Sequence, residues 1–302
     1  IPVVASREPL WDDPALAQNA ERGGYFLPGT VTGYRESLVT SPIRAEPQYL
    51  QVLPGRTASP FAAALFTAGF FLALTVQAYT FSIASAILAL MAMLRWRWET
   101  DRHVPLDNVD IGGGIMVPAN VTGPMSHGWW AIITLLIVIG MIFSMALFGN
   151  AFLWSNQPAF WSQPPAILPA LPVLGLNLAA VALSLGARWI LRRQRQGWTS
   201  AALIGATALA ISALVLENSL WRAAGFDPEM SAQAALAYTL QALQMFILVV
   251  AVLMSFNIWA RVLRGLVTAP ANTSVDVAAL FIAYCGAQGF VGSLFPRLLG
   301  VS

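Results

Sequence analysis

Few side chains of this sequence could carry chemistry inside an apolar environment. The chain has one cysteine, Cys285, and two histidines, His103 and His127, and neither histidine lies within a long apolar run. A haem held by two histidines needs both at membrane depth on facing helices, and the sequence has no HExxH, CxxC or phosphate-loop pattern. The residue types therefore predict no catalytic residue, no metal site and no cofactor-binding site in this chain.

Glu217 is the only carboxylate within an apolar run apart from Asp276, which opens the last run. An ionisable residue at membrane depth is a functional candidate by default. In one interpretation, Glu217 is a buried carboxylate that binds a partner helix or relays a proton. In the other, it lies at the membrane interface and pairs with Arg222, about one helical turn later. We favour the interfacial pair. Asp276 is interpreted as a first-turn charge that complements the dipole of its helix.

Amide side chains are the other polar groups within the apolar runs. Gln233, Gln241 and Gln244 lie in one run and Gln288 in another. A translocation path would need several such groups on one stripe together with a charge, and no charge joins Gln241 and Gln244 in the sequence. We therefore expect these amides to form hydrogen bonds between helices. A glycine at every third position over 286–292 predicts a close approach between helices.

Composition excludes several classes of protein. Of the 302 residues, 57% are hydrophobic and 10% are charged, against about 25% charged in an average soluble domain. This excludes a soluble globular enzyme and a disordered chain, and a net charge of +2 is too balanced for a nucleic-acid binder. The apolar residues form runs near the roughly 17–25 residues that cross a membrane. The sequence therefore predicts an all-α polytopic membrane protein.

Seven apolar runs are expected to form transmembrane helices. They cover residues 60–76, 80–96, 128–147, 167–190, 198–220, 233–259 and 275–294. The first two are separated by 77–79 alone, without glycine or proline, so they form either a tight hairpin or one long span. The longest loop, 99–126, then divides the helices into a group of two and a group of five. The glycine run 112–114 in this loop is interpreted as a flexible linker.

The placement of arginines decides between a hairpin and one long span. All 16 basic residues are arginines. With seven spans, all of them except Arg222 and Arg297 fall on the side of the N-terminus, as the positive-inside rule expects of the cytoplasmic side. One long first span would divide the arginines between the two sides. The sequence thus predicts a hairpin, a cytoplasmic N-terminus and a periplasmic C-terminus.

The first 58 residues differ in kind from the rest. Prolines recur through this stretch among scattered charges, and no helical period survives them. We interpret 1–58 as a proline-rich cytoplasmic arm or linker that runs over another surface, and 59–302 as the membrane domain.

A basic and aromatic cluster closes the second run. It consists of Arg95, Trp96, Arg97 and Trp98, with His103 shortly after. Tryptophans at the ends of spans are typical of the aromatic belt at the membrane interface. The guanidinium groups also suit an anionic lipid headgroup. These five residues are the candidates for a lipid site at the cytoplasmic face.

Several segments resemble the bacterial haem–copper cytochrome c oxidases in which subunits I and III are fused. Residues 6–11, 31–41, 45–47 and 53–55 are similar to the segment after the last helix of the catalytic subunit, and 147–153 and 169–177 to parts of the third and fourth helices of subunit III. Subunit III of that family has seven helices in a 2 + 5 arrangement around a lipid-filled cleft. The resemblance implies a non-catalytic, subunit III-like component that stabilises the catalytic subunit, binds phospholipid and supports proton uptake in aerobic respiration.

The resemblance also implies partners and a location. Subunits I and II of the oxidase would be the partner chains, with haem and copper in the partner, in a multi-pass chain of the bacterial inner (plasma) membrane. The enzymatic activity, proton-translocating oxidation of cytochrome c, would belong to the assembly. The chain departs from the family at 134–140, which lacks the usual Glu, and at Gln241, Gln244 and 285–288, which replace the usual His and Asp. A seven-helix transporter and an assembly scaffold are the alternatives.

Overall fold

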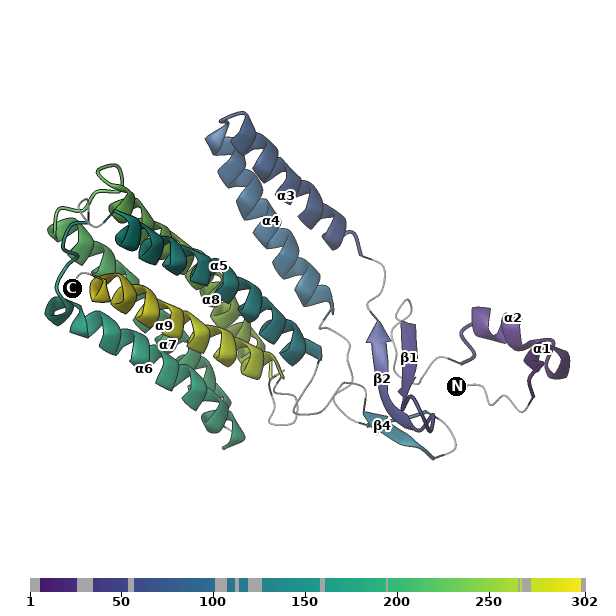
Figure 1. Ribbon diagram of the computed structural model, residues 1–302. Coiled ribbons are helices and arrows are strands. Elements are labelled where there is room, and N and C mark those ends of the chain that lie inside the picture. Colours follow the sequence, from purple (N-terminus) through teal and green to yellow (C-terminus); the bar gives the residue numbers. More distant parts are fainter. Residues whose placement is uncertain are drawn as a thin grey trace. The chain divides into compact units, whose positions relative to one another are not determined.

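The computed structural model describes residues 6–25, 35–53, 57–100, 108–111, 114–118, 127–157, 161–193, 195–265, 267 and 273–299. The chain forms two compact units, 1–122 and 123–302. The first holds two short helices, α1 (Pro9–Asp12) and α2 (Leu16–Glu21), two pairs of strands and a pair of long helices (Figure 1). The predicted boundary after residue 58, between the arm and the membrane domain, stays a prediction.

The two long helices of the first unit, α3 (Ser59–Thr75) and α4 (Tyr79–Thr100), pack against each other as a hairpin. The chain reverses at Gln77, which adopts a positive φ of 60°. Next to the turn, the Ser82 hydroxyl donates a hydrogen bond to the Phe70 carbonyl at 3.3 Å. At the open end, the hydroxyl of Ser59 donates to the carboxylate of Glu99 at 2.7 Å. The first two runs are thus two helices joined by a tight turn, as the arginine pattern predicts.

The described chain is mostly helical, as predicted, but the segments on either side of this hairpin contain short strands. Strands β1 (Arg35–Thr40) and β2 (Pro47–Leu53) pair antiparallel, as do β3 (Asn108–Asp110) and β4 (Met116–Pro118). β2 contacts β4, and the shared apolar core consists of Leu38, Leu50, Val109, Ile111 and Val117. Strands form here because apolar side chains at alternate positions face one core. Of the glycine run, Gly114, with φ of 76°, lies in the turn between β3 and β4, and Gly112 and Gly113 lie outside the described residues.

The second unit is a bundle of five helices (Figure 1). They are α5 (His127–Asn156), α6 (Ile167–Arg192), α7 (Gln196–Ala223), α8 (Ala232–Leu263) and α9 (Thr273–Leu298). α9 contacts all four of the others, so it forms the centre of the bundle.

Glycines bring α9 close to its neighbours, as their spacing predicts. A Cβ atom on Gly286 would lie 2.8 Å from the Asn177 carbonyl of α6, and one on Gly289 would lie 2.5 Å from the Asn177 side-chain oxygen. Asp276 lies in the first turn of α9, as predicted, and also accepts a 2.7 Å hydrogen bond from Nε of Arg188 on α6. This ion pair joins the C-terminal end of α6 to the N-terminal end of α9, away from the close contact at Gly286 and Gly289.

Six helices of the described chain are long and apolar enough to cross a membrane, namely α4 to α9. α3 is equally apolar in character but has 17 residues, so the predicted count of seven spans stays a prediction. The helices differ in how much of their surface the chain covers. In the most apolar 18-residue stretch, 50% of α9 is buried but only 11% of α4 and of α5. Most of the apolar surface of α4 and of α5 is therefore not covered by side chains of its own unit.

Candidate functional site

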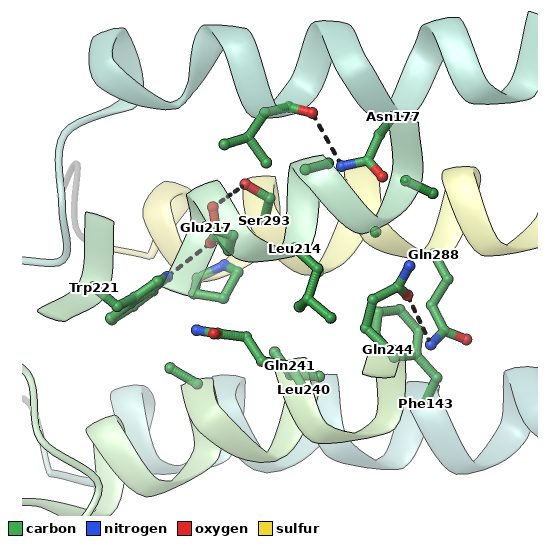
Figure 2. Close-up of a pocket in the computed structure, with 17 residues that line it drawn as sticks. Phe143, Asn177, Leu214, Glu217, Trp221, Leu240, Gln241, Gln244, Gln288 and Ser293 are labelled. Carbon is green, nitrogen blue, oxygen red and sulfur yellow. Dashed lines mark hydrogen bonds between the residues drawn. The ribbon is translucent and has the colours of Figure 1, made fainter. Parts of the chain in front are cut away.

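A pocket lined by polar side chains lies inside the five-helix bundle (Figure 2). All five helices contribute, and the polar residues that line it are Asn177, Glu217, Gln241, Gln244, Gln288 and Ser293. Trp221 and Pro296, near the C-terminal ends of α7 and α9, lie at one end of the pocket. The amides of α8 and α9 lie near the middle of their helices. The pocket thus runs from one end of the bundle towards its centre.

Glu217 is buried at the end of this pocket near the C-terminus of α7, and its partner is not Arg222, as the favoured interpretation expects. Its partner is Arg297 of α9, whose Nη1 lies 2.6 Å from Oε1 of Glu217. The side chain of Glu217 is 7% exposed and that of Arg297 is 0% exposed. Arg222, the partner expected from the sequence, is exposed. The reason is the direction of the helices: α7 and α9 both end at this side of the bundle, so a carboxylate and a guanidinium near their C-termini meet.

The carboxylate of Glu217 has three donors. Besides Arg297, Nε1 of Trp221 donates to Oε1 at 2.7 Å, and the hydroxyl of Ser293 donates to Oε2 at 2.9 Å. Figure 2 shows Trp221 and Ser293 on opposite sides of the carboxylate. A buried charge with this many donors is a fixed structural anion. A buried Glu217 could bind a partner helix or relay a proton, and these hydrogen bonds support the binding of a partner helix.

Arg297 points into the bundle although it lies one residue before the end of α9. Helical side chains tilt towards the N-terminus of their helix, so its guanidinium reaches back one turn and also donates to the carbonyl and hydroxyl of Ser293. Its Cζ lies 5.6 Å from the centre of the Trp221 ring, within cation–π range. Arginine near a span end usually extends to the interface. Here the carboxylate, the indole and Ser293 hold it inside.

The prediction that the amides form hydrogen bonds between helices is confirmed for Gln244 and Gln288 and is wrong for Gln241 within the residues that the structure describes. Nε2 of Gln244 donates to the carbonyl of Cys285 at 2.8 Å, and its Oε1 accepts from Gln288 at 3.3 Å. Gln233 bonds instead with the backbone of Ser162, at 2.8 and 2.9 Å. These contacts join α8 to α9 and to the chain that precedes α6.

Gln241 differs from the other glutamines. Its side chain is buried, yet neither Nε2 nor Oε1 has a hydrogen-bond partner among the residues that the structure describes. Within the same described part, Oδ1 of Asn177 and Oε1 of Gln288 are also without a donor. In Figure 2 the Gln241 amide points towards the end of the pocket that holds Glu217. The pocket therefore has both donors and acceptors available to a ligand.

The arrangement suits a neutral ligand that forms hydrogen bonds. Glu217 and Arg297 neutralise each other, so the pocket has no net charge to offer an ion. Cys285 is buried and its backbone, not its thiol, faces Gln244. Within the described ranges no group of three or more His, Cys, Asp and Glu side chains could hold a metal ion. Binding and helix pairing are the chemistry that this geometry can perform.

The predicted lipid candidates lie at the C-terminal end of α4. Arg95, Trp96 and Arg97 are exposed and Trp98 is half-buried. Nε of Arg95 donates to Glu99 at 2.8 Å, one turn along the helix, so this arginine is partly engaged. His103 lies outside the described residues. The structure therefore brings the four residues of α4 together on one helical turn, with Arg97 the more available cation for a headgroup.

Arg297 and Ser293 are the functional residues that the sequence analysis missed. They lie four residues apart, Ser293 in the last apolar run and Arg297 just beyond its end, and Glu217 lies near the end of a helix that runs in the same direction. Those two facts together are the signal that could have identified the pair. A comparison of the chain with protein-family models and with curated protein sequences finds no match, so its function rests on the residues and geometry described above.

Proposed function

We propose that this chain is a non-catalytic, subunit III-like component of a bacterial haem–copper cytochrome c oxidase in aerobic respiration. The observation that carries the proposal is the grouping of the long helices. α3 and α4 belong to the first compact unit and α5 to α9 to the second, and a 2 + 5 grouping is what the resemblance implies. In this role the chain stabilises the catalytic subunit and supports proton uptake, and haem and copper belong to the partner.

The uncovered faces of α4 and α5 support a role in an assembly. Large apolar side chains stay exposed along α5, among them Ile137, Met141, Met145, Phe148 and Phe152. Helices that pack in membranes present such surfaces to lipid or to other helices. We propose that these faces contact the catalytic subunit and phospholipid in the bacterial inner membrane. The exposed Arg97, next to Trp96 and Trp98, supports an anionic headgroup near the end of α4.

The pocket is the observation that bears on the alternative of a transporter. A transport path needs polar groups on both sides of a site near the membrane midplane. Towards the other end of the bundle, the side chains that follow the pocket are the apolar core residues Ala206, Ile247, Phe281 and Ile282. Among the described polar groups beyond this core, Thr207 and Ser255 bond to each other at 2.8 Å, and Arg188 pairs with Asp276 at 2.7 Å. A pocket closed on one side favours a structural component over a transporter.

Purification from native membranes through a tag on this chain tests the proposal. We expect a complex that contains haem and copper, oxidises reduced cytochrome c and consumes oxygen, while the segment expressed alone is colourless. A tagged complex without haem and copper would refute the assignment. An oxidase that lacks 59–302 is expected to keep its haem spectrum and initial rate but to lose activity faster during turnover. Immediate loss of oxygen reduction in a haem-replete complex would contradict the supporting role.

A further inference from the structure

We propose that the pocket enclosed by α5 to α9 is a water-binding site, in which Gln241, Asn177 and Gln288 hold a small cluster of internal water molecules. The site reaches from the buried Glu217–Arg297 pair to the middle of the bundle and ends there. It is a property of this chain alone and holds whether or not the chain belongs to an oxidase.

The first step of the argument is the cost of unbonded amides. Gln241 is 8% exposed, and both polar atoms of its amide are buried without a partner among the described residues. An unsatisfied buried donor or acceptor costs about 1–3 kcal/mol, and in hydrocarbon nothing else can bond to it. Native interiors place ordered water at such groups. Gln241 therefore identifies where a ligand binds, and its donor and acceptor together suit a molecule that both accepts and donates.

The second step is the available space. The cavity volume open to the centre of a water-sized sphere is about 30 Å³, and about 10–15 Å³ suffices for one buried water. The space thus fits a cluster of a few waters. A buried water also needs two to four polar partners. The lining supplies them in Gln241, Oδ1 of Asn177, Oε1 of Gln288 and the carboxylate of Glu217.

The third step excludes charged ligands. Glu217 is already paired with Arg297 at 2.6 Å, so a cation or an anion in the pocket would enter a site without net opposing charge. Desolvating such an ion costs several kcal/mol. Water and small neutral hydrogen-bonding molecules meet no such penalty, and the volume selects water.

The extent of the site follows from the residues beyond it. Gln244 and Gln288 bond to each other at mid-helix, and the next layer consists of the core residues Ala180, Ala206, Ile247 and Ile282. These apolar side chains offer a water molecule no hydrogen bond. Water should therefore lie next to Phe143 and Leu240, which line the pocket, and be absent around Phe281 and Leu203, which do not.

Radiolytic hydroxyl labelling of the full chain in lipid nanodiscs tests this placement, because buried side chains are oxidised only next to bound water. Phe143 and Phe281 are 7% and 1% exposed and have the same intrinsic reactivity, so they form a matched pair. We expect labelling of Phe143 and Leu240 but not of Phe281 and Leu203. Equal labelling within both pairs, or no labelling in either, would overturn the proposal, and this comparison needs no substitution.

A substitution then tests the role of the amide. Gln241→Leu keeps the size of the side chain and removes its hydrogen bonds, so labelling of Phe143 should be lost. Asn257→Leu, an amide on the same helix outside the pocket, should leave the labelling unchanged. If Phe281 stays unlabelled in both variants, the bundle is still packed. Persistent labelling of Phe143 in Gln241→Leu would refute the assignment of the water to Gln241.

Discussion

Replacement of Arg297 by Met should be among the most damaging single substitutions in the bundle. The change leaves the carboxylate of Glu217 buried with two neutral donors, Trp221 and Ser293, and without its counter-charge. Removing one partner of a buried ion pair typically costs about 3–5 kcal/mol. Met fills a volume similar to the aliphatic part of Arg, so the loss measures charge more than packing.

The depth of Glu217 determines which end of that range applies. α7 has 28 residues, hence a length of about 42 Å at 1.5 Å per residue, against about 30 Å of hydrocarbon. A centred helix then extends about 6 Å beyond each boundary. Glu217 lies six residues, or about 9 Å, before the end of α7, so its Cα lies about 3 Å inside the boundary. Charges are less costly there than at the centre, and we expect a loss of about 3 kcal/mol, roughly a hundredfold in the unfolding equilibrium.

Reversible unfolding in mixed micelles, followed by tryptophan fluorescence, would measure this loss. Arg222→Met is the matched control, because Arg222 is exposed at the same end of α7 and should change stability by less than about 0.5 kcal/mol. The double variant Glu217→Leu with Arg297→Met should recover most of the loss, since a buried ion pair and an apolar pair of similar volume are often close in stability. An equal effect of Arg222→Met and Arg297→Met would refute the ion pair assigned here.

Three further outcomes are expected. Gly286→Ala should destabilise the bundle by about 1–3 kcal/mol in the same unfolding assay, because its new methyl meets the backbone of α6. Gly186→Ala should be neutral or stabilising, because a Cβ atom there has nothing within 4 Å. Cysteine labelling in intact cells, after removal of the native cysteine, should place Arg193 in the cytoplasm and Asn156 outside, and labelling of both from one side would contradict the seven-span topology. Arg97→Gln should lower the anionic lipid retained by the purified protein in native mass spectrometry, and unchanged retention would leave the aromatic belt as the whole explanation of this cluster.

Hydropathy and charge were sufficient to predict the long helices and the turn between α3 and α4, because span length and arginine placement are properties of a local segment. They were less able to predict helix ends. The run 128–147 continues as α5 to Asn156, since polar residues such as Asn150 continue a helix without adding hydropathy. The strands were missed because proline and charge in 1–58 hide the alternation that Leu38 and Leu50 complete only when the two strands pair.

The pocket could not be predicted from the sequence for a different reason. Gln241 and Gln244 were recognised as polar positions, but whether each finds a partner depends on the neighbouring helix, and only Gln244 does. The partner of Glu217 was sought one turn away on the same helix, where sequence distance is informative. Its actual partner is on a helix that is distant in the chain, and a pairing of that kind depends on the packing of the bundle.

The contact between β2 and β4 depends on how the chain is inserted during synthesis. The ribosome completes β1 and β2 before α3, whereas β4 emerges only after α4, so Leu50 has no partner from β4 until the hairpin has been synthesised. If α3 and α4 crossed as one continuous span, β4 would be delivered to the opposite face of the membrane and could never reach Leu50. Exposed apolar strands are the surfaces that chaperones and proteases recognise in immature chains. The small sheet would thus mark correctly inserted molecules and leave misinserted ones open to degradation.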